Sequence, residues 1–132
     1  MEFKKNQTIY MQIADFICEN IMSQNWPEGE KIASVREFAA RVEVNPNTVM
    51  RTYSHLQDEG IIFNKRGIGF FVQDGASEKI TNMQKQDFIN NILPDFFKKM
   101  KVLKIEFSEL KELYSQIENN SSENFQNGST SN

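Results

Sequence analysis

The chain has 132 residues, with 15 basic and 18 acidic side chains and a formal net charge of −3. This length allows one domain, or a small domain with an appendage. The excess of acidic residues excludes a strongly basic nucleic-acid binder, the kind that a high isoelectric point alone would identify. A single cysteine and a single histidine exclude a disulfide framework and an ordinary structural zinc site, so we expect no metal and no cofactor.

No apolar run approaches the ~18 residues that are needed to span a bilayer. Residues 1–12 hold two lysines but no apolar core of a signal peptide. We therefore expect a cytoplasmic chain without a membrane partner. A Walker loop, a nucleophile elbow, a zinc-protease motif and a catalytic Cys/His pair are all absent from the sequence. Since this length also leaves little room for a concave site, we expect that the chain is not an enzyme.

The first predicted helix covers residues 8–24. Trp26 and Pro27 then break the pattern. Cys18 lies beside the apolar stripe of this helix, and we interpret it as buried filler rather than as a redox sensor. The stripe itself recurs at near-helical spacing: Ile9, Ile13, Phe16, Ile17 and Ile21.

A short second helix is predicted over residues 34–42, where Ser34 and Glu37 form the S-x-x-E pattern of a capping box. After a very short turn, Asn45 is a favourable N-cap. Pro46 suits the first helical position because its missing N–H would have no partner there. A third helix is therefore expected over residues 46–59, with one core face: Val49, Tyr53 and Leu56.

After residue 60 the spacing of the apolar residues is no longer helical, and it indicates two short strands of a small hairpin. Residues 61–63 and 70–72 are short β-type runs. The turn between them contains glycine and two cations, Lys65 and Arg66.

From residue 77 to about 104 the pattern is helical again, although Pro94 should kink or interrupt the helix. The apolar stripe on this helix is broad and needs a cover. We favour a seam between two copies over a ligand pocket, because a lone two-helix arm cannot cover such a surface. The stripe has these members: Phe88, Ile89, Ile92, Leu93, Phe96, Phe97 and Met100.

These elements predict a mostly helical fold with a small β-hairpin. Residues 1–75 are expected to form a winged helix-turn-helix, and residues 76–118 a short two-helix C-terminal dimerisation arm that includes a last helix capped by Ser108. Residues 119–132 are nearly all small and polar, so we expect a disordered tail.

The third predicted helix carries the residue types that read DNA. Asn47 and Thr48 lie in its first turn, and the N-terminal residues of a recognition helix meet base edges in the major groove. Arg51 follows one turn later, within reach of guanine or phosphate. Lys65 and Arg66 at the hairpin tip are candidates for phosphate or minor-groove contact.

Several motifs in order resemble the DNA-binding domain of GntR-type bacterial transcription regulators. The N-P-N-T-V-x-R-x-Y segment and the small two-helix C-terminus are similar to the YtrA subgroup. The segments that carry the resemblance are IASVREFA (32–39), VNPNTVMRTY (44–53), EGII (59–62) and RGIGFFV (66–72).

The resemblance implies a homodimeric repressor that reads a palindromic operator in double-stranded DNA. Members of this subgroup often control neighbouring transporter genes, so it also implies such targets beside the chain's own operon. Carried over to matching positions, it implies a set of DNA contacts: Ser34, Arg36, Asn45, Asn47, Thr48, Arg51 and the wing tip Arg66-Gly67, which Lys65 adjoins.

The sequence departs from the family pattern at several positions. The family usually has Gly where Glu43 stands, and if the backbone there is left-handed, Glu costs about 1 kcal/mol relative to Gly. Ile68 and Phe70 replace a basic or polar residue and a threonine of the wing.

Other interpretations stay open at this point. Winged helices also bind proteins, so a protein-interaction module without specific DNA binding is the main alternative. Nothing in the sequence indicates a small-molecule effector, although a regulator gated by one is a variant of the DNA-binding hypothesis. Judged from the residues alone, we interpret Asn45 as a helix cap and nothing more. For Arg36 we favour the DNA contact over a pair with a carboxylate on its own helix.

Overall fold

The computed structural model describes residues 7–130, and the side chains of residues 7–121. It divides into two compact units, of which the first ends at Gln86. The first unit contains α1 (Ile9–Met22), α2 (Val35–Val42), α3 (Pro46–Asp58), β1 (Ile62–Lys65), β2 (Gly69–Val72) and all but the last residue of α4 (Ala76–Asp87). The second unit contains the π-helix η1 (Phe88–Ile92), α5 (Leu93–Val102) and α6 (Phe107–Thr130).

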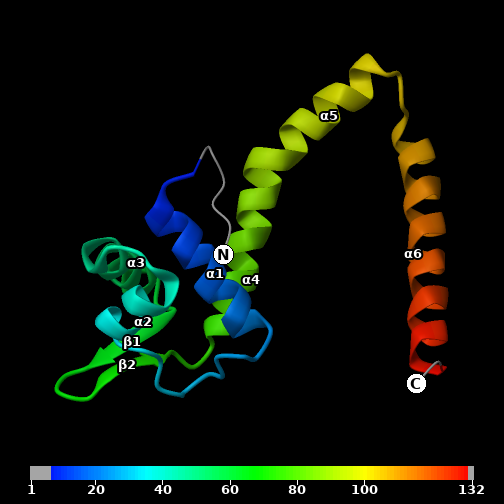
Figure 1. Ribbon diagram of the computed structural model, residues 1–132. Helices are drawn as coiled ribbons and strands as arrows, with labels where there is room; N and C mark the ends of the chain where they lie inside the picture. Colours follow the sequence, from blue (N-terminus) through cyan, green and yellow to red (C-terminus); the bar gives the residue numbers. More distant parts are fainter. Residues whose placement is uncertain (1–6, 131–132) are drawn as a thin grey trace. The chain divides into compact units, whose positions relative to one another are not determined.

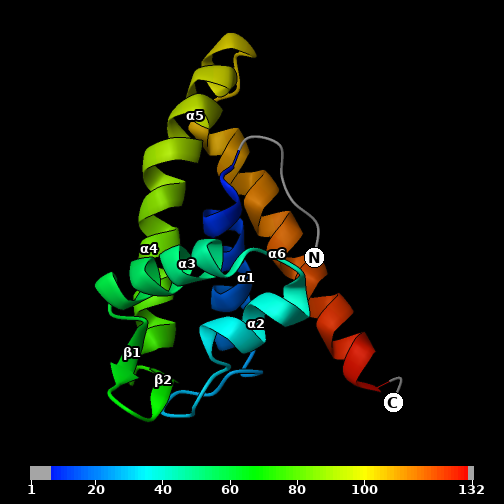
Figure 2. The same cartoon turned by 60° about the vertical axis from the view of Figure 1, so that its left-hand side comes forward.

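The first unit is a winged helix-turn-helix. Figure 1 shows α1, α2 and α3 grouped beside the β1–β2 hairpin. Figure 2 shows α3 lying across α1, and both α1 and α2 contact α3. The two strands pair antiparallel, from Ile62 opposite Val72 to Lys65 opposite Gly69. The predicted fold class, mostly helical with a small hairpin, is therefore confirmed.

The predicted apolar faces of α1 and α3 meet in one core. Ile13, Ile17 and Ile21 of α1 are buried, whereas Ile9 is exposed and Phe16 packs at the edge. The expected core face of α3 is buried without exception. The hairpin and the residue before it add further apolar residues to this core: Ile61, Ile62 and Val72.

The first unit extends further along the chain than the boundary at residue 75 that the sequence suggested. Ala76 and Ile80 of α4 are buried and belong to the core. The turn that begins α4 is held by the Glu28 carboxylate, which accepts a hydrogen bond from the backbone N–H of Gly75. The first turns of α4 are thus part of the winged domain, because they bury one face in it.

The expected interruption near Pro94 is confirmed. The chain forms the π-helix η1 just before it, and the backbone N–H of Leu93 bonds to the carbonyl oxygen of Phe88. Proline lacks an N–H and its ring crowds the carbonyl four residues earlier, here that of Asn90, so the α-helical pattern cannot continue unchanged.

The C-terminal segment differs from the expected disordered tail. The helix α6 continues through residues 119–130, and residues 131–132 lie outside the described part of the chain. These residues contain no proline and extend a helix that has already begun, which requires only propagation and not a new nucleus. Of the helices between residues 7 and 130, none has the length and apolarity to cross a membrane.

Candidate nucleic-acid interface

The start of α3 presents polar side chains on a well-formed helix terminus. Asn45 is the N-cap, and its side-chain oxygen accepts a hydrogen bond of 2.8 Å from the backbone N–H of Asn47. Pro46 occupies the first turn, as predicted. Asn47 is exposed and Thr48 is half-buried. Since the Asn45 oxygen is used by the cap, its capping role is the one that the geometry supports directly.

Arg51 lies one turn after Asn47 and is also exposed. Both side chains border a pocket with residues from the start of α1. Its lining residues are Thr8, Ile9, Tyr10, Asn47, Thr48 and Arg51. Asn47, Thr48 and Arg51 are therefore brought together at one edge of the domain, as the sequence predicted, and α1 contributes the opposite wall.

Tyr10 is the residue of this pocket that sequence reasoning missed. The guanidinium carbon of Arg51 lies 3.9 Å from the centroid of the Tyr10 ring, within the range of a cation–π contact. The Tyr10 ring also meets the ring of His55 edge to face, with centroids 6.2 Å apart. No local pattern signals this contact, because Tyr10 and Arg51 are far apart in the sequence.

Two hydrogen bonds fix α3 to its neighbours. The Thr52 hydroxyl donates to the carbonyl oxygen of Tyr10 at 2.9 Å, and the Tyr53 hydroxyl donates to the carbonyl oxygen of Ala33 at 2.7 Å. Burial raises the pKa of the Tyr53 hydroxyl well above its usual range, so it keeps the proton that it donates. The exposed face of α3 is consequently presented on a rigid support.

The start of α2 has one of the two hydrogen bonds of the predicted capping box. Ser34 is the N-cap, and its side-chain oxygen accepts a hydrogen bond of 3.2 Å from the backbone N–H of Glu37. Arg36 is exposed, and within the described residues its side chain forms no hydrogen bond or ion pair. The carboxylate partner that we considered for Arg36 is thus not present, and the guanidinium is available to a ligand.

The turn between α2 and α3 contains a residue with a left-handed backbone. This residue is Glu43, where the family usually has glycine. Glu43 has φ 56° and ψ 47°, and the cap N–H bonds to the carbonyl oxygen of Ala39. This conformation ends α2 and lets α3 begin at once.

The wing tip is exposed and tightly turned. The backbone N–H of Ile68 bonds to the carbonyl oxygen of Lys65 at 2.9 Å, and Gly67 has φ +81°. The Lys65 ammonium lies 5.2 Å from the centroid of the Phe71 ring. Lys65, Arg66 and Gly67 are all exposed, which leaves the two cations free to approach a phosphate backbone.

Phe70, which departs from the family pattern, points toward the core. Its ring meets that of Tyr53 nearly perpendicularly, with centroids 5.0 Å apart. Ile68 is 55% exposed at the tip. Thus one of the two apolar wing residues is explained by packing, and nothing in the structure explains the other.

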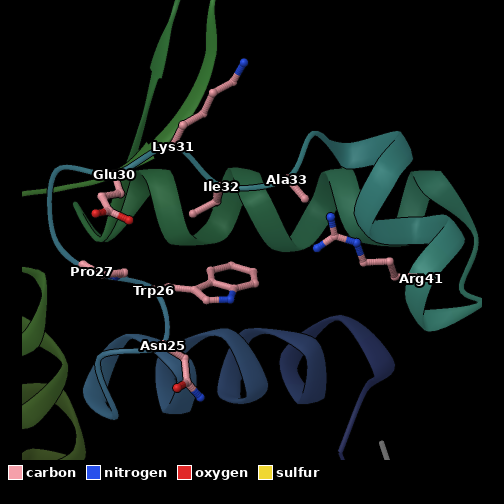
Figure 3. A pocket seen from close by; sticks show the side chains of 8 residues that line it. All are labelled: Asn25, Trp26, Pro27, Glu30, Lys31, Ile32, Ala33 and Arg41. Atoms are coloured by element: carbon pink, nitrogen blue, oxygen red, sulfur yellow. The ribbon is translucent and has the colours of Figure 1, made fainter.

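A second pocket is lined by the loop that joins α1 and α2 and by one residue of α2 (Figure 3). Its lining residues are Asn25, Trp26, Pro27, Glu30, Lys31, Ile32, Ala33 and Arg41. In Figure 3 the Trp26 ring lies between α1 and the Ile32–Ala33 stretch, and the Arg41 side chain reaches in from α2. The Trp26 ring also packs edge to face on Phe38, with centroids 5.9 Å apart. This pocket shares no residue with the one beside α3.

Cys18 is half-buried beside the core. Burial, together with the nearby carboxylates of Asp15 and Glu19, raises the pKa of its thiol to about 12. The thiol is protonated at neutral pH, which fits a packing role. In the described part of the chain, no group of three or more His, Cys, Asp or Glu side chains is placed to hold a metal ion.

The predicted dimerisation residues lie on η1 and α5, in the second unit. Leu93 and Met100 are half-buried. The others expose between 40% and 50% of their surface: Phe88, Ile89, Ile92, Phe96 and Phe97. Within the described residues, η1 and α5 therefore leave several large apolar side chains at least partly exposed.

The chain is similar to proteins of known class. Residues 9–72 match the model of the bacterial regulatory proteins of the gntR family. An uncharacterized HTH-type transcriptional regulator, YhcF, from Bacillus subtilis (strain 168) is 37% identical over 84% of this chain and 90% of its own length. The HTH-type transcriptional repressor YtrA of the same organism is 37% identical over 55% of this chain and 56% of its own length.

A solved structure extends the likeness beyond the winged domain. A crystal structure from Bacteroides thetaiotaomicron, described as a transcriptional regulator of the GntR family, is 42% identical with a TM-score of 0.81. The match covers 86% of this chain and 99% of that one. The winged fold, the caps of α2 and α3 and these likenesses agree: the chain belongs to the gntR family of bacterial regulatory proteins.

Proposed function

We propose that this chain, a DNA-binding transcription regulator of the gntR family, acts as a homodimeric repressor of its own operon and reads a palindromic operator. Its family membership supports a DNA-binding regulator and not a protein-interaction module. The observation that carries the proposal is the exposed start of α3, where Asn47, Thr48 and Arg51 border one pocket on a rigidly held helix.

Each group of contacts has a separate role in this proposal. Asn47, Thr48 and Arg51 meet base edges in the major groove, since an asparagine amide matches adenine and an arginine guanidinium matches guanine. The remaining contacts position the domain on the phosphate backbone and carry no sequence information of their own: Ser34, Arg36, Asn45, Lys65, Arg66 and Gly67.

A second copy of the chain would cover the exposed apolar face of η1 and α5. Large contiguous apolar patches on a chain of this size mark an interaction surface. A two-fold symmetric pair also suits a palindrome, because its recognition helices can enter successive major grooves about 34 Å apart. The few cations of one winged domain bind weakly, so two domains must act together.

Repression follows from the simplest consequence of operator binding, which is exclusion of the transcription machinery from a promoter. The repressor YtrA, similar over 55% of this chain, supports this direction of regulation. Transporter genes beside the operon are further targets in the proposal, and we propose that the chain acts in the cytoplasm, where its DNA target lies. The proposal needs neither a catalytic group nor a small-molecule effector.

A gel-shift experiment tests the proposal. The probe is a duplex from the chain's own promoter, and the control is a shuffled duplex of equal length and composition. We expect the promoter duplex to bind at least ~10³-fold more tightly at physiological salt. Its dissociation constant should also rise steeply with salt, because bound cations release counterions from DNA. Equal binding to both duplexes would contradict the proposal.

A further inference from the structure

Arg51 of α3 contacts an aromatic ring of α1. Its guanidinium carbon is 3.9 Å from the centroid of the Tyr10 ring. Arg51 is otherwise exposed, and a free arginine side chain in water samples many rotamers. The contact with Tyr10 selects one region of that conformational space before any ligand arrives.

Tyr10 is itself fixed, so it can serve as a support. Its backbone carbonyl accepts the Thr52 hydroxyl at 2.9 Å, and its half-buried ring meets His55 edge to face at an interplanar angle of 80°. Thr52 is fully buried between α1 and α3. Tyr10 is thus attached to the same stretch of α3 that carries Arg51.

The contact with the Tyr10 ring leaves the guanidinium able to bind. A guanidinium that stacks on an aromatic face keeps its N–H groups around the rim, where they can form paired hydrogen bonds in the plane. The same pocket places this group beside Asn47 and Thr48. The N–H groups of the Arg51 guanidinium therefore lie on the same surface as the side chains of Asn47 and Thr48.

We propose that Tyr10 is a positioning residue for DNA recognition. Its ring holds the Arg51 guanidinium beside Asn47 and Thr48 in the free protein, so that these side chains meet base edges as a pre-arranged set. This inference rests on the proposed function. Pre-organisation strengthens binding because less side-chain freedom is lost when the complex forms.

The first test uses the free protein and no DNA. The ¹⁵N relaxation of the Arg51 side-chain Nε reports how far the guanidinium is restricted. We expect a restricted guanidinium in the wild-type chain and in Tyr10→Phe, which keeps the ring, and a mobile one in Tyr10→Leu. An Arg51 side chain that is equally mobile in the wild-type chain and in Tyr10→Leu would overturn the proposal, whatever the chain binds.

The second test is a double-mutant cycle on the promoter duplex. Tyr10→Leu should weaken binding about two- to fivefold, the range of an exposed cation–π contact, whereas Tyr10→Phe should keep the wild-type affinity. In an Arg51→Ala background, Tyr10→Leu should have no further effect. An equal loss in both backgrounds would show that Tyr10 only supports the fold and would overturn the proposal.

The two tests also separate this inference from the function on which it rests. If the wild-type chain binds promoter and shuffled duplexes equally, the proposed function fails, and the relaxation measurement still decides whether Tyr10 positions Arg51. Thermal unfolding of Tyr10→Leu provides the check that the variant is folded before either measurement is interpreted.

Discussion

The Tyr53 hydroxyl donates a hydrogen bond of 2.7 Å to the carbonyl oxygen of Ala33, and so ties the middle of α3 to the segment that leads into α2. The Tyr53 side chain is fully buried, and its ring packs between those of Phe38 and Phe70. One residue thus connects both helices of the helix-turn-helix with the wing.

Tyr53→Phe tests this connection. It keeps the ring but leaves the Ala33 carbonyl without its partner, so we expect the free energy of unfolding to fall by about 1–2 kcal/mol. Chemical denaturation monitored by circular dichroism measures the change. Tyr114→Phe, at a tyrosine that is 66% exposed, is the matched control and should leave stability unchanged. An unchanged Tyr53→Phe would mean that the hydrogen bond contributes nothing net.

Glu43→Gly should stabilise the chain. Glu43 has a left-handed backbone, which glycine adopts without the steric conflict of a Cβ atom. We expect a gain of about 1 kcal/mol in the free energy of unfolding, measured in the same way. Glu43→Ala retains the Cβ and should give no such gain. A loss of stability in Glu43→Gly would show that the carboxylate contributes more than the backbone strain costs.

The apolar face of η1 and α5 predicts dimerisation. Ile92→Asp places a charge within the proposed seam, so we expect sedimentation equilibrium to show a shift from dimer to monomer. Lys98→Asp is the matched control, because Lys98 lies on α5, which follows η1 directly, but is not among the apolar residues of the seam, and it should leave the dimer intact. A wild-type chain that sediments as a monomer at micromolar concentration would contradict the proposed seam.

Local chemistry in the sequence predicted the parts of the fold that depend on neighbouring residues. The caps of α2 and α3 follow from Ser34 and Asn45, whose side chains bond to backbone N–H groups within a turn. The interruption before Pro94 follows from the missing proline N–H. The backbone of Glu43 is left-handed, which the sequence had left open.

Features that depend on contacts between distant residues could not be predicted. Ala76 and Ile80 pack into the winged domain, although composition suggested that the domain ends before them. The placement of Arg51 on Tyr10 joins two helices through a side-chain contact that no spacing in the sequence encodes. For the same reason the candidate site was predicted only in part. The sequence identified its side chains on α3, but not the residues at the start of α1 that line the same pocket.

The most direct measurement is the affinity of Asn47→Ala and Arg66→Ala, each titrated with the promoter duplex and with the shuffled duplex. Asn47 is exposed at the start of α3 and Arg66 at the wing tip. We expect Asn47→Ala to reduce the preference for the promoter duplex about tenfold or more, the range of one lost base contact. Arg66→Ala should weaken binding to both duplexes by the same factor, as expected for a phosphate contact. Equal losses on both duplexes for Asn47→Ala would contradict the claim that the start of α3 reads the operator.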